Sequence, residues 1–171
     1  MVQPAAIYAD LTDVCRFAAD QAEALKDDAS ARRWLAISLV IALQGACACA
    51  LAANGLDEDI LETGDETKLA APGFLLRRVS SASYLADPAR LLLPNAALKD
   101  LDALIGERNA AIHLVGGQAA PPRAFRVAAD ALDHLLVSQP AFDLVLFGAR
   151  PARIKASLSR LRSALKYLPT D

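Results

Sequence analysis

Apolar side chains recur every three or four residues along most of this chain, which is the spacing of one buried helix face. The pattern predicts helices over 5–26, 31–53, 74–85, 95–115, 123–137 and from Pro151 onward. Ser30 and Asn95 stand at the start of two of these segments and are candidate N-caps. We therefore expect an all-α protein, folded as an up-and-down helical bundle with an extra C-terminal helix.

The segment 31–53 differs from the other predicted helices because it carries no charge after Arg33. An uncharged run of about 20 residues is long enough to cross a membrane, and Arg32 and Arg33 flank it on one side. The centre of a helical bundle has the same composition, since the amphipathic helices around it need a core to cover. Gln44 near the middle disfavours lipid exposure, so we expect a buried central helix and no membrane partner.

Two segments outside the predicted helices do not show a clear secondary-structure pattern. The segment 56–66 is acidic without a basic residue, and it is expected to form a solvated loop or a short helix. Its carboxylates lack the spacing of a calcium loop, and no cysteine or histidine cluster has zinc-site spacing, so no metal or cofactor is expected. The apolar stretch 141–147 fits either a short strand or a buried helical turn.

The last predicted helix combines an apolar stripe with a basic surface. The stripe consists of Ile154, Leu158, Leu161, Leu165 and Leu168. The basic side chains around it are Arg150, Arg153, Lys155, Arg160, Arg162 and Lys166. Such a surface is either solvated, balancing the acidic segment, or binds phosphate groups. We favour the solvated surface.

Composition and charge limit the classes of protein that fit. The length of 171 residues suggests one domain spanning 1–171. A net charge of −2 excludes a general polyanion binder, so any nucleic-acid surface must be local. Cys15, Cys47 and Cys49 form no CxxC pair, which favours buried thiols in a reducing compartment. The N-terminus lacks the basic region of a signal peptide, so a cytoplasmic location is expected.

The helix over 95–115 has an arginine where its apolar stripe predicts a core residue. Arg108 occupies the missing step of that stripe, whose other members are Leu98, Leu101, Ile105, Ile112 and Val115. A buried guanidinium is costly unless it has an anionic partner. That partner is either an acid of the chain, such as Glu107 or Asp102, or a ligand. In the first case His113 only interacts with the helix dipole; in the second, Arg108, Asn109 and His113 form a site.

Arg108 and Asn109, followed by three residues and His113, lie late in a helix of an all-helical chain. This arrangement resembles the signature of the HEPN superfamily (higher eukaryotes and prokaryotes nucleotide-binding domain). The helix that begins at Arg33-Trp34-Leu35 is similar to those that precede the motif in such proteins. The resemblance covers residues 5–138 and is specific only at 108–113. It implies a HEPN-like bundle.

The resemblance also implies a metal-independent endoribonuclease, frequently the toxin of a toxin–antitoxin or defence system. Such proteins act as dimers in which two motifs line one cleft. The implied partners are RNA, a second copy of the chain, and a cognate antitoxin or nucleotidyltransferase-like protein. RNA supplies its own 2′-OH nucleophile, so the site needs only a proton carrier and a cation. His113 can carry the proton, Arg108 can hold the phosphate oxygens, and Asn109 can orient either group.

Two other classes of function stay open. One is a non-catalytic HEPN-like module that binds a protein partner or a nucleotide, and activity on RNA separates it from the enzyme. The other is a small membrane-associated helical protein, and solubility without detergent separates it. His134, with Asp130 and Asp133 nearby, is expected to be an exposed or half-buried histidine rather than a second catalytic one.

Overall fold

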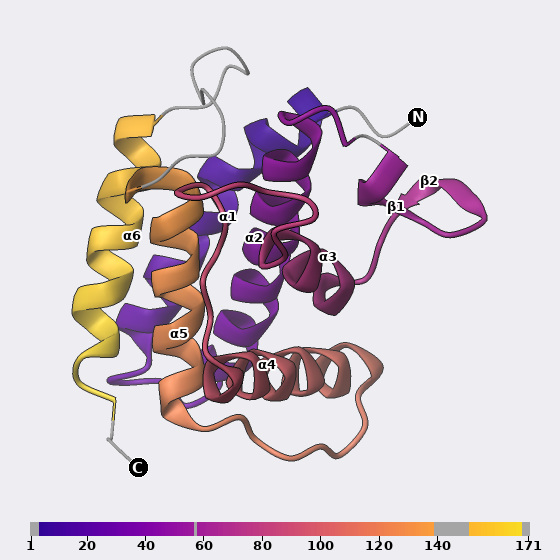
Figure 1. The fold of residues 1–171 in the computed structure, drawn as a ribbon. Helices are drawn as coiled ribbons and strands as arrows, with labels where there is room; N and C mark the ends of the chain where they lie inside the picture. The colour runs from indigo at the N-terminus through magenta and orange to yellow at the C-terminus, as the bar shows by residue number, and fades with distance from the viewer. Residues whose placement is uncertain (1–3, 57, 139–150, 169–171) are drawn as a thin grey trace.

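The computed structural model describes residues 4–56, 58–138 and 151–168, and most of them are helical (Figure 1). This confirms the all-α class predicted from the apolar periodicity. The α-helices are α1 (Pro4–Ala24), α2 (Ala31–Ala52), α3 (Pro72–Val79), α4 (Asn95–His113), α5 (Pro122–Asp133) and α6 (Pro151–Leu165). A π-helical turn, η2 (His134–Ser138), extends α5. The stretch 141–147 lies outside the described residues.

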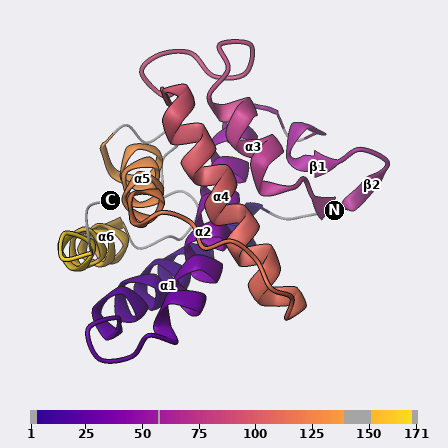
Figure 2. The ribbon, with the colours of Figure 1, turned by 90° about the horizontal axis from the view of Figure 1, so that it is seen from below.

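The helices do not all run up and down. In Figure 1, α2, α5 and α6 run roughly upright, and α4 lies across their lower end. Figure 2, seen from below, shows α5 and α6 nearly end-on while α4 crosses the bundle diagonally. α1 packs against α2 and α6, and α4 packs against α2 and α5. An up-and-down arrangement therefore does not describe α4, the helix that carries the motif.

α2 is the central helix, as its uncharged sequence predicts. It contacts α1, α3, α4 and α5, and its side chains from Leu35 to Leu51 are mostly buried. Small residues such as Ala42, Ala46 and Ala50 let the neighbouring helices approach closely. α2 is long and apolar enough to cross a membrane by length and composition, but 78% of its most apolar window is buried inside the bundle.

The three cysteines lie in this core. Cys15 on α1 and Cys47 and Cys49 on α2 are each fully buried. Burial raises the pKa of the Cys15 thiol to about 12 and raises that of Cys47 further, because a thiolate is poorly solvated there. The prediction of buried thiols is confirmed.

Ser30 occupies the predicted N-cap position of α2 without making a capping bond, and the predicted cap at Asn95 is wrong. Ser30 precedes α2, but its hydroxyl donates to the Asp28 carboxylate at 2.9 Å and makes no capping bond. Asp28 also accepts the backbone N–H of Ser30, so a local turn competes with the cap. Asn95 is the first residue of α4, and Pro94 occupies the cap position.

The acidic segment contains a short helix, one of the two predicted forms, and also the first part of a small β-hairpin, which was not predicted. A 3-10 turn, η1 (Glu58–Ile60), leads into β1 (Leu61–Glu62), which pairs antiparallel with β2 (Asp65–Leu69). Gly64 adopts φ +86° in the tight turn between the strands. An ion pair between Lys68 and Glu62 at 2.6 Å joins them. Strands this short leave too little alternation to be recognised in a sequence.

The helix predicted over 74–85 is shorter than expected. α3 ends at Val79, and turns follow. The Ser81 hydroxyl oxygen accepts the Ser83 N–H at 3.2 Å, a local bond that competes with helix continuation. The C-terminal stripe is confirmed by contrast, since Ile154, Leu158, Leu161 and Leu165 are all buried.

Candidate functional site

Only the first half of α4 is buried. Ala97, Asp100, Leu101 and Leu104 face the bundle. Beyond them no α4 residue is fully buried, and the C-terminal end of the helix extends past the other helices, as Figures 1 and 2 both show. The predicted stripe therefore fails at its C-terminal end, where Ile112 is 44% exposed and Val115 60% exposed. The motif lies on this projecting half.

Arg108 is half-buried and has no acidic partner among the described residues. Its Nη1 donates to the Asn109 side-chain oxygen at 2.9 Å, and its Nε is buried without a hydrogen-bond partner. Both acids that could have neutralised it are paired elsewhere, Glu107 with Arg32 at 2.9 Å and Asp102 with Arg77 at 3.9 Å. The interpretation that Arg108 pairs with one of these acids is therefore wrong.

His113 is the last residue of α4, and its side chain is exposed. Within the part of the chain that the structure describes, no hydrogen bond joins His113 to Arg108 or Asn109. The structure thus brings Arg108 and Asn109 together and leaves His113 one turn further along the helix. One copy of the chain carries the three residues on the last turns of α4, and only Arg108 and Asn109 are joined by a hydrogen bond among the described residues.

α4 ends at a residue that is unusual for a helix terminus. Leu114 adopts φ +54°, in the left-handed region, and its side chain is 79% exposed. Its neighbour Val115 donates to the Ala110 carbonyl oxygen at 3.1 Å, which closes the helix end. α4 therefore ends about one turn before the predicted stop at Gly116-Gly117. Gly117 then passes so close to α4 that a Cβ there would lie 2.5 Å from the Ala110 Cβ.

Replacing Leu114 with glycine should stabilise the fold by about 0.5–1 kcal/mol. A left-handed conformation costs an L-residue about 1–2 kcal/mol, and the greater flexibility of glycine in the unfolded chain offsets part of that gain. The measurement is the urea midpoint at unchanged m-value. Val115→Gly is the matched control, because Val115 has no positive φ, and it should not stabilise. An unchanged or lower midpoint for Leu114→Gly would show that the strain is compensated locally.

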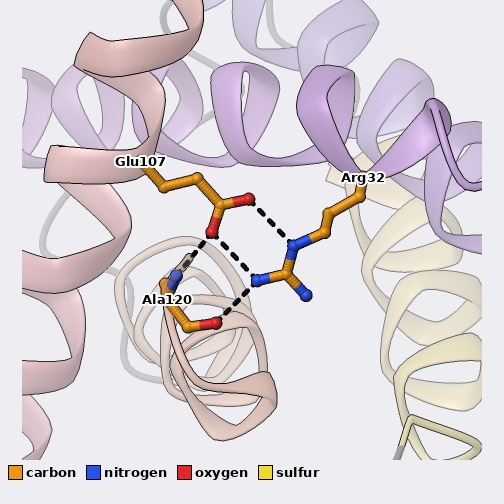
Figure 3. Close-up of polar contacts among 3 residues, drawn as sticks. All are labelled: Arg32, Glu107 and Ala120. Atoms are coloured by element: carbon orange, nitrogen blue, oxygen red, sulfur yellow. Dashed lines mark hydrogen bonds and ion pairs between the residues drawn. The ribbon is translucent and has the colours of Figure 1, made fainter. Parts of the chain in front are cut away.

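A half-buried polar network next to the motif joins three parts of the chain (Figure 3). Arg32 on α2 donates from Nε and Nη2 to the two carboxylate oxygens of Glu107, each at 2.9 Å. Arg32 Nη2 also donates to the Ala120 carbonyl oxygen at 2.6 Å, and the Ala120 N–H donates to Glu107 at 2.7 Å. The Arg32 guanidinium lies 4.7 Å from the centre of the Phe125 ring. Sequence reasoning missed this network because its members are far apart along the chain.

The neighbouring Arg33 reaches the same helix. Its Nη2 donates to the Ala111 carbonyl oxygen at 2.7 Å, one of the carbonyls that α4 leaves unbonded near its end. Its guanidinium also lies 5.7 Å from the Trp34 ring centre. Arg32 and Arg33 therefore attach the start of α2 to the motif helix, a role different from flanking a membrane span.

Two basic side chains of α6, Arg160 and Arg162, form ion pairs with acids of the chain. Arg160 pairs with Asp20 and Glu23 at 2.7 and 2.6 Å, and hydrogen bonding to Arg160 lowers the pKa of Glu23. Arg162 pairs with Asp130 at 3.2 Å and lies near Asp133. These pairs support the solvated interpretation of this face over phosphate binding.

His134 lies in the π-helical turn after α5 and is half-buried, as expected. Its Nε2 is buried without a hydrogen-bond partner among the described residues. The same part of the chain contains no group of three His, Cys, Asp or Glu side chains positioned to hold a metal ion.

Comparison of the chain with protein-family models, with curated proteins and with solved structures found no match.

Proposed function

We propose that this chain is a metal-independent endoribonuclease of HEPN type, with a HEPN-like fold and a cytoplasmic location, acting as a toxin or defence component. The observation that carries the proposal is that Arg108 lacks an anionic partner among the described residues. Arg32, one helix away, has its Nε and Nη2 bonded to both carboxylate oxygens of Glu107 and to a backbone carbonyl. Arg108 is half-buried, has a buried Nε without a partner and meets no carboxylate among the described residues. A cation with this incomplete bonding suits an anionic ligand better than a structural role.

The three motif residues supply what cleavage of RNA requires. The RNA 2′-OH attacks the adjacent phosphorus, the bond to the 5′-oxygen breaks, and a 2′,3′-cyclic phosphate remains. Arg108 stabilises the negative charge that develops on the phosphate oxygens. The hydrogen bond from Arg108 to Asn109, at 2.9 Å, orients the guanidinium. His113, exposed at the helix end, takes the proton from the 2′-OH as general base, and the departing 5′-oxygen takes up a proton and leaves as a hydroxyl.

A second copy of the chain completes the site in this proposal. His113 is not hydrogen-bonded to Arg108 or Asn109 in one copy, so a twofold arrangement would let the two motifs share one cleft. Exposed Ile112, Leu114 and Val115 surround His113 on the projecting end of α4 and offer an apolar contact surface. Sedimentation at micromolar concentration should then give about twice 18.1 kDa. A strict monomer would leave each site with one motif only.

The test of the enzyme is cleavage of a broad panel of RNAs by the purified protein. Cleavage should persist in excess chelator, and the products should end in a 2′,3′-cyclic phosphate or 3′-phosphate. DNA of the same sequence should survive because it lacks the 2′-OH. A dimer that leaves every RNA intact would refute the enzyme.

The second candidate is a non-catalytic HEPN-like module that binds a protein partner or a nucleotide. It is favoured by the separation of His113 from Arg108 and Asn109 in one copy. In that case Arg108 would hold an anionic group of the partner, such as an antitoxin or a nucleotidyltransferase-like protein, without cleavage. Binding of an RNA that is never cut would support this candidate.

A further inference from the structure

The network of Arg32, Glu107 and Ala120 lies directly beside the motif. Glu107 is half-buried and precedes Arg108 in α4, and it accepts three hydrogen bonds, two from Arg32 and one from the Ala120 backbone. Successive helix residues are separated by about 100° of rotation. Fixing Glu107 against α2 therefore fixes the direction in which Arg108 leaves the helix.

The same network holds the segment 114–121 against α4. This segment leaves the end of α4 and returns beneath it to reach α5 in Figure 1. It is attached near one end by the bond from Val115 to Ala110 and at the other by the bond from Ala120 to Glu107. Between them, Gly117 passes against Ala110. The segment thus lies along the side of α4 that carries Glu107 and Ala110.

A second ion pair on α4 provides a structural comparison for the Glu107 network. Arg123 on α5 donates from Nε to both oxygens of Asp100, each at 2.9 Å, and Asp100 is buried. Asp100 lies two turns before Glu107 and away from the motif. It ties α4 to α5.

We propose that Arg32 and Glu107 are positioning residues, which hold the 114–121 segment against α4 and set the orientation of Arg108 and His113. This inference rests on the proposed ribonuclease for its kinetic consequence. Neither residue touches the RNA; both act through the motif helix. Misplacing catalytic groups by a fraction of an ångström lowers turnover more than substrate binding.

The experiment compares Glu107→Gln with Asp100→Asn, which removes a similar carboxylate from the same helix. Both are assayed on one RNA at a temperature where circular dichroism shows each to be fully folded. Glu107→Gln should lower kcat roughly tenfold or more with KM little changed, while Asp100→Asn keeps the kcat of the wild type. Arg32→Lys serves as a second variant if Glu107→Gln does not fold, because lysine keeps the charge but cannot bind both carboxylate oxygens.

Amide hydrogen exchange supplies a readout that does not depend on cleavage. Exchange at Val115 and Ala120 should accelerate roughly tenfold in Glu107→Gln, through local opening, and stay at the wild-type rate in Asp100→Asn. If the wild type cuts RNA and Glu107→Gln cuts equally well, positioning is overturned and the ribonuclease stands. If the wild type cuts no RNA, the ribonuclease fails and exchange alone decides: acceleration confined to Glu107→Gln supports the positioning role, and equal exchange in both variants refutes it.

Discussion

Arg108→Ala should lower RNA cleavage by about a hundredfold or more in a protein that remains folded and dimeric. The guanidinium would stabilise charge that appears only in the transition state, so kcat should fall more than RNA affinity. Losing the half-buried side chain also removes its packing and its bond to Asn109. The fold of the variant must therefore be verified by its urea midpoint. Arg108→Lys should recover only a small part of the activity, because an ammonium cannot bind two phosphate oxygens side by side.

Two further variants distinguish the role of His113 from that of His134. His113→Ala should cost about as much as Arg108→Ala if His113 transfers the proton. His134→Ala is the matched control, because His134 lies in the turn after α5 rather than on α4. It should cut RNA as well as the wild type. A folded His113→Ala protein with full activity would end the enzyme proposal and leave the binding module in its place.

Leu43→Asp should prevent folding, with a loss of more than about 4 kcal/mol, because it puts an unpaired carboxylate in the centre of the bundle. Leu43 is 1% exposed on the central helix. Ile41→Asp is the matched control on the same helix, since Ile41 is 41% exposed and its substitution should cost about 1 kcal/mol or less. Circular dichroism and urea titration measure both. Equal tolerance of the two substitutions would show that α2 is not a core helix.

The helices were predictable because their apolar residues repeat with helical spacing, and α2 was predictable as the core because it carries no charge after Arg33. The orientation of α4 was not predictable from the same signal. A periodic stripe shows which face of a helix is apolar, but it does not show where the neighbouring helices end. Ile112 and Val115 therefore fit the stripe and still lie at the surface.

The site was predictable only in part. Arg108, Asn109 and His113 were found as a short motif within one helix, where spacing determines proximity. The Arg32 network was not found, because a contact between residues 32 and 107 leaves no trace in local spacing. Ser30 and Asn95 were assigned as caps from residue type alone. The Ser30 hydroxyl bonds to Asp28 instead of to the start of α2. The helix α4 begins at Asn95 itself, so Pro94 occupies the cap position.

Because Cys15, Cys47 and Cys49 are completely buried, the reactivity of their thiols reports whether the chain is folded. A thiol without access to solvent cannot exchange with a disulfide or react with an alkylating reagent while the helices stay packed. Disulfide-linked species on a non-reducing gel would therefore come from molecules that have opened, not from native association. The rate of alkylation would then report how often the core around α2 opens.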